Sequence, residues 1–118
     1  SVGSPIIDNP DVLIVMNLPS LDKYEKTVKK GGVIFVDSTL IERKVVRDDV
    51  KVFYIPSTKI AQDMGTPNLA NIVLLGKVLK ECPEIGMDGM EEALRKVVSK
   101  RPEMYETNMK AVEAGYNY

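Results

Sequence analysis

Short runs of apolar residues come first along the chain, and apolar residues at helical spacing follow them. The runs are Asp11–Met16, Val33–Val36 and Val50–Ile55, and the first of them is continuous rather than alternating. A continuous run of this length is typical of a strand that is covered on both faces. The pattern therefore predicts three strands in the first half of the chain, the first of them covered on both faces.

Apolar residues between the first two runs recur at the spacing of a helix. They predict a helix over 19–30, with Asn17 or Ser20 as its cap and a glycine pair as its stop. A strand, a helix and a strand in this order predict a right-handed βαβ unit with parallel strands. Residues 40–50 are polar and charged and predict a surface connection, with at most a short extended piece.

The second half of the chain predicts helices. They are expected over 57–64, 68–81, 89–100 and 102–114, and the last of them should stop at Gly115. The helix over 68–81 is apolar around more than half its circumference, so it should be buried nearly all round. The last helix carries an apolar stripe of Met104, Tyr105, Met109 and Val112.

The order of elements predicts an α/β fold. We expect a small parallel or mixed sheet with a βαβ unit and a helical C-terminal region, in three layers, and a single domain over 1–118. Three strands make a narrow sheet, and the chain opens on Ser1 without an initiator Met. Both features indicate a fragment from which an upstream part is missing.

Composition excludes several classes of function. The chain has 118 residues, a net charge of -1, no His and one Cys. Without His or a second Cys, the usual zinc sites, an iron–sulfur cluster held by this chain alone, and Ser-His-Asp or Cys-His catalysis are excluded. No basic stripe predicts nucleic-acid binding, and no apolar run approaches the ~20 residues of a membrane helix. We predict no catalytic or metal-binding residue, and a packed rather than reactive Cys82.

Polar residues follow the ends of the predicted strands, where ligands gather in parallel α/β sheets. The candidates for cofactor binding are Asn17, Asp37, Ser38, Thr39, Ser57 and Thr58. The alternative is that these residues act as helix caps and turn formers, because their side chains bond readily to nearby backbone groups.

Candidate interface residues lie in the helical half. Asn68 can cap the long helix, and Asn71 places an amide on an apolar helix, where it needs either a buried hydrogen bond or a partner. Gly76 costs about 1 kcal/mol relative to Ala, which predicts close approach of another backbone. Tyr116 belongs to a tyrosine-rich chain end that either docks on its own domain or contacts a partner.

Several segments occur in a familiar order: Asp11–Met16 with the helix after it, Gly31–Ser38, Ile55–Ala61, Asn68–Gly76 and Asn108–Tyr116. Together, over most of the chain, they resemble the gamma subunit or domain of the pyruvate, 2-oxoglutarate and branched-chain 2-oxoacid:ferredoxin oxidoreductases. The family subunit opens with a strand and a GxGGQG-type glycine loop, then an Arg-Gly-Gly-like segment, and neither is present here. The resemblance thus implies the C-terminal part of a gamma subunit.

The resemblance also implies a role. The complex converts a 2-oxoacid to an acyl-CoA by oxidative decarboxylation and reduces ferredoxin, and this chain would be a non-catalytic component of it. Thiamine diphosphate and iron–sulfur clusters would lie in alpha, beta and delta-type partner subunits, with ferredoxin met indirectly. Coenzyme A is the cofactor linked to the gamma domain. A cytoplasmic location is expected, and apolar surface meant for partners would allow self-association. The alternatives are a small-ligand-binding regulatory domain and an independent enzyme.

Overall fold

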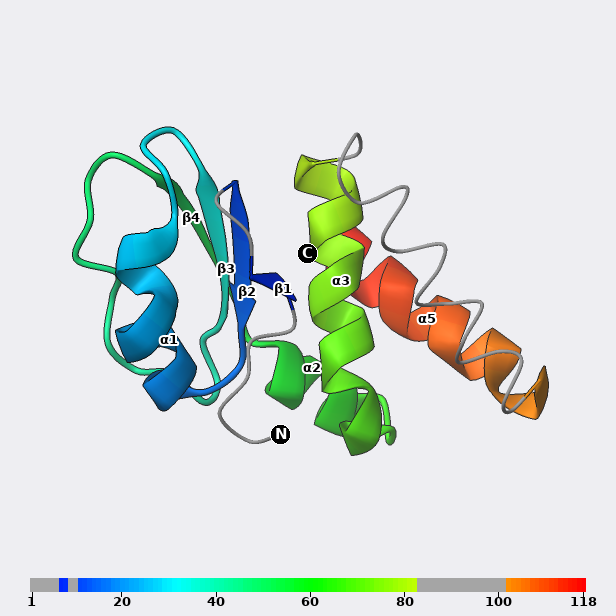
Figure 1. The fold of residues 1–118 in the computed structure, drawn as a ribbon. Helices are drawn as coiled ribbons and strands as arrows, with labels where there is room; N and C mark the ends of the chain where they lie inside the picture. Colours follow the sequence, from blue (N-terminus) through cyan, green and yellow to red (C-terminus); the bar gives the residue numbers. More distant parts are fainter. Residues whose placement is uncertain (1–6, 9–10, 83–101) are drawn as a thin grey trace. The chain divides into compact units, whose positions relative to one another are not determined.

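The computed structural model describes residues 7–8, 11–82 and 102–118, which fall into two compact units, 1–56 and 57–118 (Figure 1). The sheet belongs to the first unit, and the second unit is helical. The helix predicted over 89–100 lies outside the described residues.

The first unit is a mixed sheet with one crossover helix. Its elements are β1 (Ile7–Asp8), β2 (Val12–Val15), α1 (Leu18–Tyr24), the 3-10 turn η1 (Glu25–Thr27), β3 (Val33–Asp37) and β4 (Lys51–Ile55). In the order β1-β2-β3-β4, the last three strands run parallel and β1 pairs antiparallel with β2. The predicted strands and the βαβ unit are confirmed. The apolar pattern missed β1, because two residues are too few to show a period.

One face of the sheet packs with α1. Leu13 and Val15 of β2 lie beside Ile34 and Val36 of β3, and all four are fully buried. Leu21 of α1 joins them in one apolar cluster. Burying side chains of this size contributes roughly 1.5–3 kcal/mol each, so this cluster holds α1 on the sheet.

The opposite face of the sheet is also apolar. Phe35 stacks on Phe53 across β3 and β4, with ring centroids 5.1 Å apart and an interplanar angle of 18°. Val12, Ile14 and Phe35 are fully buried. Strand side chains alternate between the two faces, so burial of both explains why the apolar runs are continuous.

The helix predicted over 19–30 ends sooner than its pattern indicated. The 3-10 turn η1 closes it at Thr27, and Val28 is extended, with φ −73° and ψ 132°. Thr27 Oγ1 donates to the carbonyl oxygen of Tyr24 at 2.7 Å, and the Val28 side chain joins the apolar cluster. The prediction was wrong because Val28 fits the helical spacing yet reaches the core from extended backbone.

The second unit consists of helices. They are α2 (Ser57–Asp63), the 3-10 turn η2 (Pro67–Leu69), α3 (Ala70–Glu81), the 3-10 turn η3 (Pro102–Met104) and α5 (Tyr105–Tyr116). Every residue of α3 from Ile72 to Val78 is buried, which confirms the predicted burial of this helix. Gly65, with φ +79°, lies two residues after the end of α2, where its left-handed backbone suits a helix stop.

The backbones of α3 and α5 approach each other closely through two glycines. A Cβ atom on Gly76 would lie 2.9 Å from the carbonyl carbon of Val112, and one on Gly115 would lie 2.8 Å from that of Val73. Both would lie closer still to the carbonyl oxygens. Carbon contacts are ordinarily ~3.5–4.0 Å, so only glycine fits at either position. The close approach predicted for Gly76 is confirmed, and the approaching backbone belongs to the same chain.

The same crossing overturns two predictions for the last helix. Gly115 lies inside α5 and does not stop it. Tyr105 is 54% exposed, whereas the buried residues of α5 are Asn108, Ala111, Val112 and Gly115. Where two helices cross closely, the face between them needs small residues. The prediction followed the large apolar residues instead, and therefore placed the buried face wrongly.

Candidate functional site

The carboxyl edge of the parallel strands carries four of the predicted site residues. Asn17 follows β2, Asp37 ends β3, and Ser38 and Thr39 come directly after it. Because β2 and β3 are parallel neighbours, these residues lie at the same edge of the sheet.

Hydrogen bonds within the chain engage two of these side chains. Asn17 Oδ1 accepts from the Ser20 N–H at 2.9 Å and caps α1. Asp37 is fully buried, and its Oδ1 accepts from the Thr39 N–H at 3.0 Å. The cap and turn interpretation is confirmed for Asn17 and Asp37. Ser38 is half-buried and Thr39 is exposed.

Exposed leucines stand at this edge beside the polar residues. Leu18 is 41% exposed and Leu40 is 52% exposed. Each follows the end of one of two adjacent parallel strands. Exposed apolar side chains of this kind suit contact with a protein.

Ser57 and Thr58 open α2 and belong to the second unit. Ser57 is fully buried, and among the described residues its Oγ has no hydrogen-bond partner. Thr58 is half-buried. A buried hydroxyl without a partner costs stability, so Ser57 is an unexplained polar group in the described structure.

Two expectations for the start of α3 are wrong. The cap position of α3 is Leu69 rather than Asn68, because η2 runs directly into the helix. Asn71 is exposed and therefore needs no buried partner. Tyr116 is 48% exposed, so docking on its own chain does not cover it. A partner contact through Asn68, Asn71 or Tyr116 stays a prediction.

Sequence reasoning missed a polar network that fixes the connection between β3 and β4. Its centre is Glu25, whose side chain is only 10% exposed. Glu25 Oε1 accepts from Arg43 Nη2 at 2.9 Å, and Oε2 accepts from the Val46 N–H at 2.8 Å. Hydrogen bonds to Glu25 and then to Asp22 raise the pKa of Arg43. The sequence did hold one sign of this network: Glu25 follows Leu21 by four residues, which places a carboxylate on the apolar stripe of the helix.

Arg47 ties the same connection to η1. Its guanidinium donates to both Asp49 carboxylate oxygens at 2.9 and 2.8 Å, to the carbonyl oxygen of Glu25 at 3.1 Å, and to that of Val28. The hydrogen bond from Arg47 is the main cause that lowers the pKa of Asp49. The connection has no regular secondary structure, yet it is anchored at several points.

Within 7–8, 11–82 and 102–118, no three His, Cys, Asp or Glu residues gather as a metal site would require. No helix in those ranges has both the length and the apolarity to cross a membrane. Cys82 is buried, as predicted.

The fold defines an α/β module built on one βαβ unit and followed by packed helices. Comparison with known families then matches residues 1–118 to the family described as Pyruvate ferredoxin/flavodoxin oxidoreductase. The chain belongs to this family, which confirms the resemblance drawn from its segments.

Named relatives narrow the comparison. The chain is 35% identical over 117 residues to the 2-oxoglutarate synthase subunit KorC of Methanocaldococcus jannaschii, a match that covers 98% of this chain and 62% of the relative. It is 31% identical over 122 residues to the ketoisovalerate oxidoreductase subunit VorA of Methanothermobacter marburgensis, covering 99% of this chain and 24% of the relative.

A solved structure supports the same family assignment. The crystal structure of the gamma subunit of a keto/oxoacid ferredoxin oxidoreductase from Geobacter sulfurreducens PCA superposes with a TM-score of 0.71 at 30% identity. The match covers 91% of this chain and 62% of that one, and it confirms the α/β fold class. The chain thus spans less than two thirds of each of these three relatives.

Proposed function

We propose that this chain is the C-terminal part of a gamma component of a 2-oxoacid:ferredoxin oxidoreductase, and that it supplies subunit contacts rather than catalytic groups. The observation that carries the contact role is the carboxyl edge of the first unit. Leu18 and Leu40 are exposed there, while Asn17 and Asp37 are engaged within the chain. Exposed apolar side chains at an edge with engaged polar groups suit a protein partner.

The relatives support this assignment. The names of two of them are those of subunits of a 2-oxoglutarate synthase and a ketoisovalerate oxidoreductase. The match covers 62% of one and 24% of the other, so the same module occurs in chains of unequal length. A module that recurs in chains of different length suits a role in assembly.

The complex in this proposal oxidatively decarboxylates a 2-oxoacid to an acyl-CoA and reduces ferredoxin. Its partners are alpha, beta and delta-type subunits in the cytoplasm, which hold the thiamine diphosphate and the iron–sulfur clusters. The chain supplies part of a gamma subunit, since it spans 62% of the gamma subunit from Geobacter sulfurreducens PCA. Alone, it turns over no 2-oxoacid.

Contact with coenzyme A is the finer part of the proposal. Ser38 and Thr39 bring hydroxyl groups to the carboxyl edge, and thermal shift measures whether the cofactor binds there. Ligand binding stabilises a protein by RT ln(1 + [L]/Kd), so the melting temperature should rise with coenzyme A concentration. A melting temperature that stays constant up to millimolar coenzyme A would refute the proposed contact with coenzyme A and leave the proposed subunit role unaffected.

The subunit role is tested in the assembled complex. A gamma subunit with Leu18→Ser and Leu40→Ser should co-purify with the other subunits about tenfold more weakly, because losing two apolar contacts costs on the order of 1.4 kcal/mol or more. The matched control is Tyr105→Ser, which changes an exposed aromatic residue of the second unit. Circular dichroism verifies that all variants fold. Equal recovery of the leucine variant and the wild type would overturn the assignment of this edge.

A further inference from the structure

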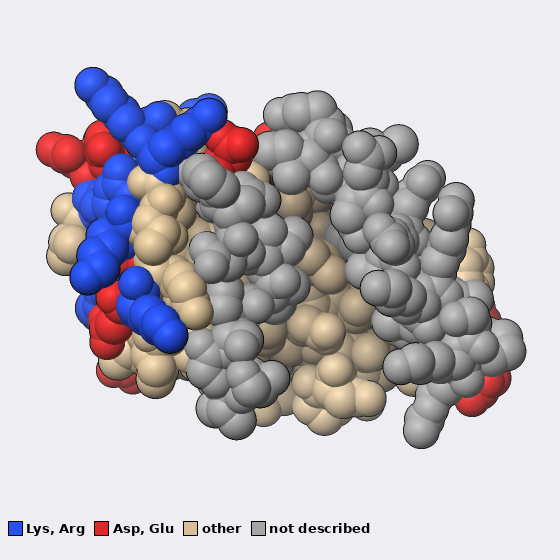
Figure 2. All heavy atoms as spheres, viewed as in Figure 1, with Lys and Arg blue, Asp and Glu red and all other residues tan. Residues whose placement is uncertain are grey.

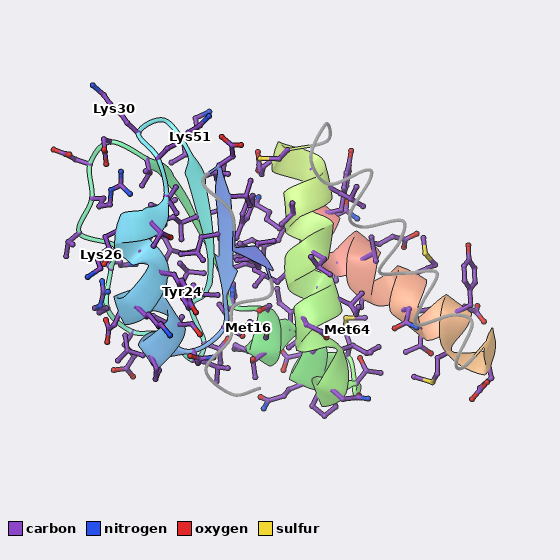
Figure 3. The ribbon with its side chains drawn as sticks, in the orientation of Figure 1. Met16, Tyr24, Lys26, Lys30, Lys51 and Met64 are labelled. Carbon is purple, nitrogen blue, oxygen red and sulfur yellow. The ribbon has the colours of Figure 1, made fainter. Side chains whose placement is uncertain are left out.

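The first unit also has a basic surface, away from the leucine edge. Lys30 precedes β3 and Lys51 opens β4, so both lie at the amino ends of the parallel strands. Lys26 lies in η1, which leads to the same end of the sheet. All three are exposed. Figure 3 labels these lysines, and Figure 2 shows Lys and Arg side chains gathered over this part of the unit.

Of these lysines, Lys30 interacts electrostatically with the carboxylate of Asp49 without forming an ion pair with it. In the described part of the chain, none of Lys26, Lys30 and Lys51 forms an ion pair. Arg43 and Arg47, by contrast, are engaged by Asp22, Glu25 and Asp49. The available cations on this surface are therefore lysines.

An exposed valine of the same unit stands on a fixed backbone near Lys26. Val46 is 80% exposed, and its N–H donates to the carboxylate of Glu25, the residue before Lys26. The N–H of Val45 donates to the hydroxyl of Tyr54 at 2.9 Å. A loop held in this way loses little conformational freedom on binding, so an apolar contact made by Val46 would contribute efficiently.

Backbone geometry at this edge does not suit a phosphate. The Gly31 N–H donates to the Asp49 carbonyl at 2.8 Å, and the Lys51 N–H donates to the Gly32 carbonyl at 2.9 Å. Phosphate sites use converging backbone N–H groups or Arg forks, which are engaged here. Exposed lysines on flexible stems, with an exposed apolar side chain on the same unit, fit a broad acidic surface instead.

We propose that the basic face formed by Lys26, Lys30, Val46 and Lys51 docks a protein with an acidic surface. The lysines steer and orient the partner, and Val46 makes the central apolar contact. This surface shares no residue with the Leu18 and Leu40 edge, so the two proposals can fail separately.

The test uses the full chain and a defined probe, a 20-residue Glu-rich peptide with one central Leu. Replacing Lys26, Lys30 and Lys51 by Gln should weaken binding about tenfold at low salt and flatten its salt dependence. The matched control replaces Lys59, Lys80 and Lys110 of the second unit by Gln, which changes the net charge equally. This control should bind within about twofold of the wild type.

Two further arms separate a protein contact from simple charge attraction. Val46→Ser should weaken the Leu peptide about threefold or more and leave a matched peptide with Ser in place of Leu unchanged. Tripolyphosphate should compete no better than its ionic strength explains. Equal losses in both lysine variants, equal effects of Val46→Ser on the two peptides, or tight tripolyphosphate binding to the three lysines would each overturn the proposal.

Discussion

Replacing the paired glycines of α3 and α5 by Ala changes the free energy of unfolding, and the sign of that change separates local helix propensity from tertiary packing. In an isolated helix, replacing Gly by Ala stabilises by about 1 kcal/mol. In this protein, a Cβ on Gly76 or Gly115 meets backbone atoms of the facing helix at 2.9 or 2.8 Å. Backbone atoms cannot rotate away as a side chain can, so the helices themselves must separate.

The required separation sets the magnitude. Carbon atoms prefer ~3.5 Å or more, so relief of the carbon contacts alone would move the two helices apart by roughly 0.6–0.7 Å, and the nearer carbonyl oxygens require more. A gap of this size forfeits a quarter or more of the dispersion energy of the atoms at the crossing. Overpacking of this kind typically costs ~1–3 kcal/mol. We expect Gly76→Ala and Gly115→Ala each to lower the free energy of unfolding, despite the gain in helix propensity.

Urea unfolding followed by circular dichroism measures this change. Asn71→Ala is the control, because it adds a strong helix former at an exposed position of α3 and should stabilise by about 0.5 kcal/mol. The double glycine variant should lose less than the sum of the single losses, because one separation accommodates both methyl groups. Stabilisation by about 1 kcal/mol in either single variant would refute the close crossing.

Two further predictions concern the anchored connection between β3 and β4. Glu25→Gln should lower the free energy of unfolding by about 1–3 kcal/mol in urea titrations, because it leaves Arg43 without its buried counter-charge; a loss below about 0.5 kcal/mol would contradict the role of this network. The pKa of Asp49 is lowered mainly by its hydrogen bond from Arg47. Ionised Asp49 therefore contributes its full stabilisation of the folded state above about pH 4, and this stabilisation disappears as the pH falls through the lower folded pKa. Asp49→Asn should therefore melt below the wild type at pH 7, with the gap in melting temperature closing as the pH falls through the lowered pKa of Asp49; a gap that is constant with pH would exclude this linkage.

Much of the first unit followed from the sequence because its signals are local. The continuous runs predicted β2, β3 and β4 because strand side chains alternate and both faces are apolar. Asn17 was one of two predicted caps for α1, since a cap and the N–H it accepts from lie only three residues apart. The order of the same segments was enough to indicate the family before any comparison.

Other features were decided only in three dimensions. Neither the exposure of Asn71 nor the burial of Glu25 can be read from apolar spacing, because each depends on what the fold places beside it. The partner of Gly76 lies more than thirty residues away along the chain. The sequence by itself determined which segments become strands and helices and how they begin, through interactions spanning a few residues. The tertiary structure alone decided which glycines meet, which charges are neutralised and which leucines stay exposed, because those outcomes depend on contacts between residues distant in sequence.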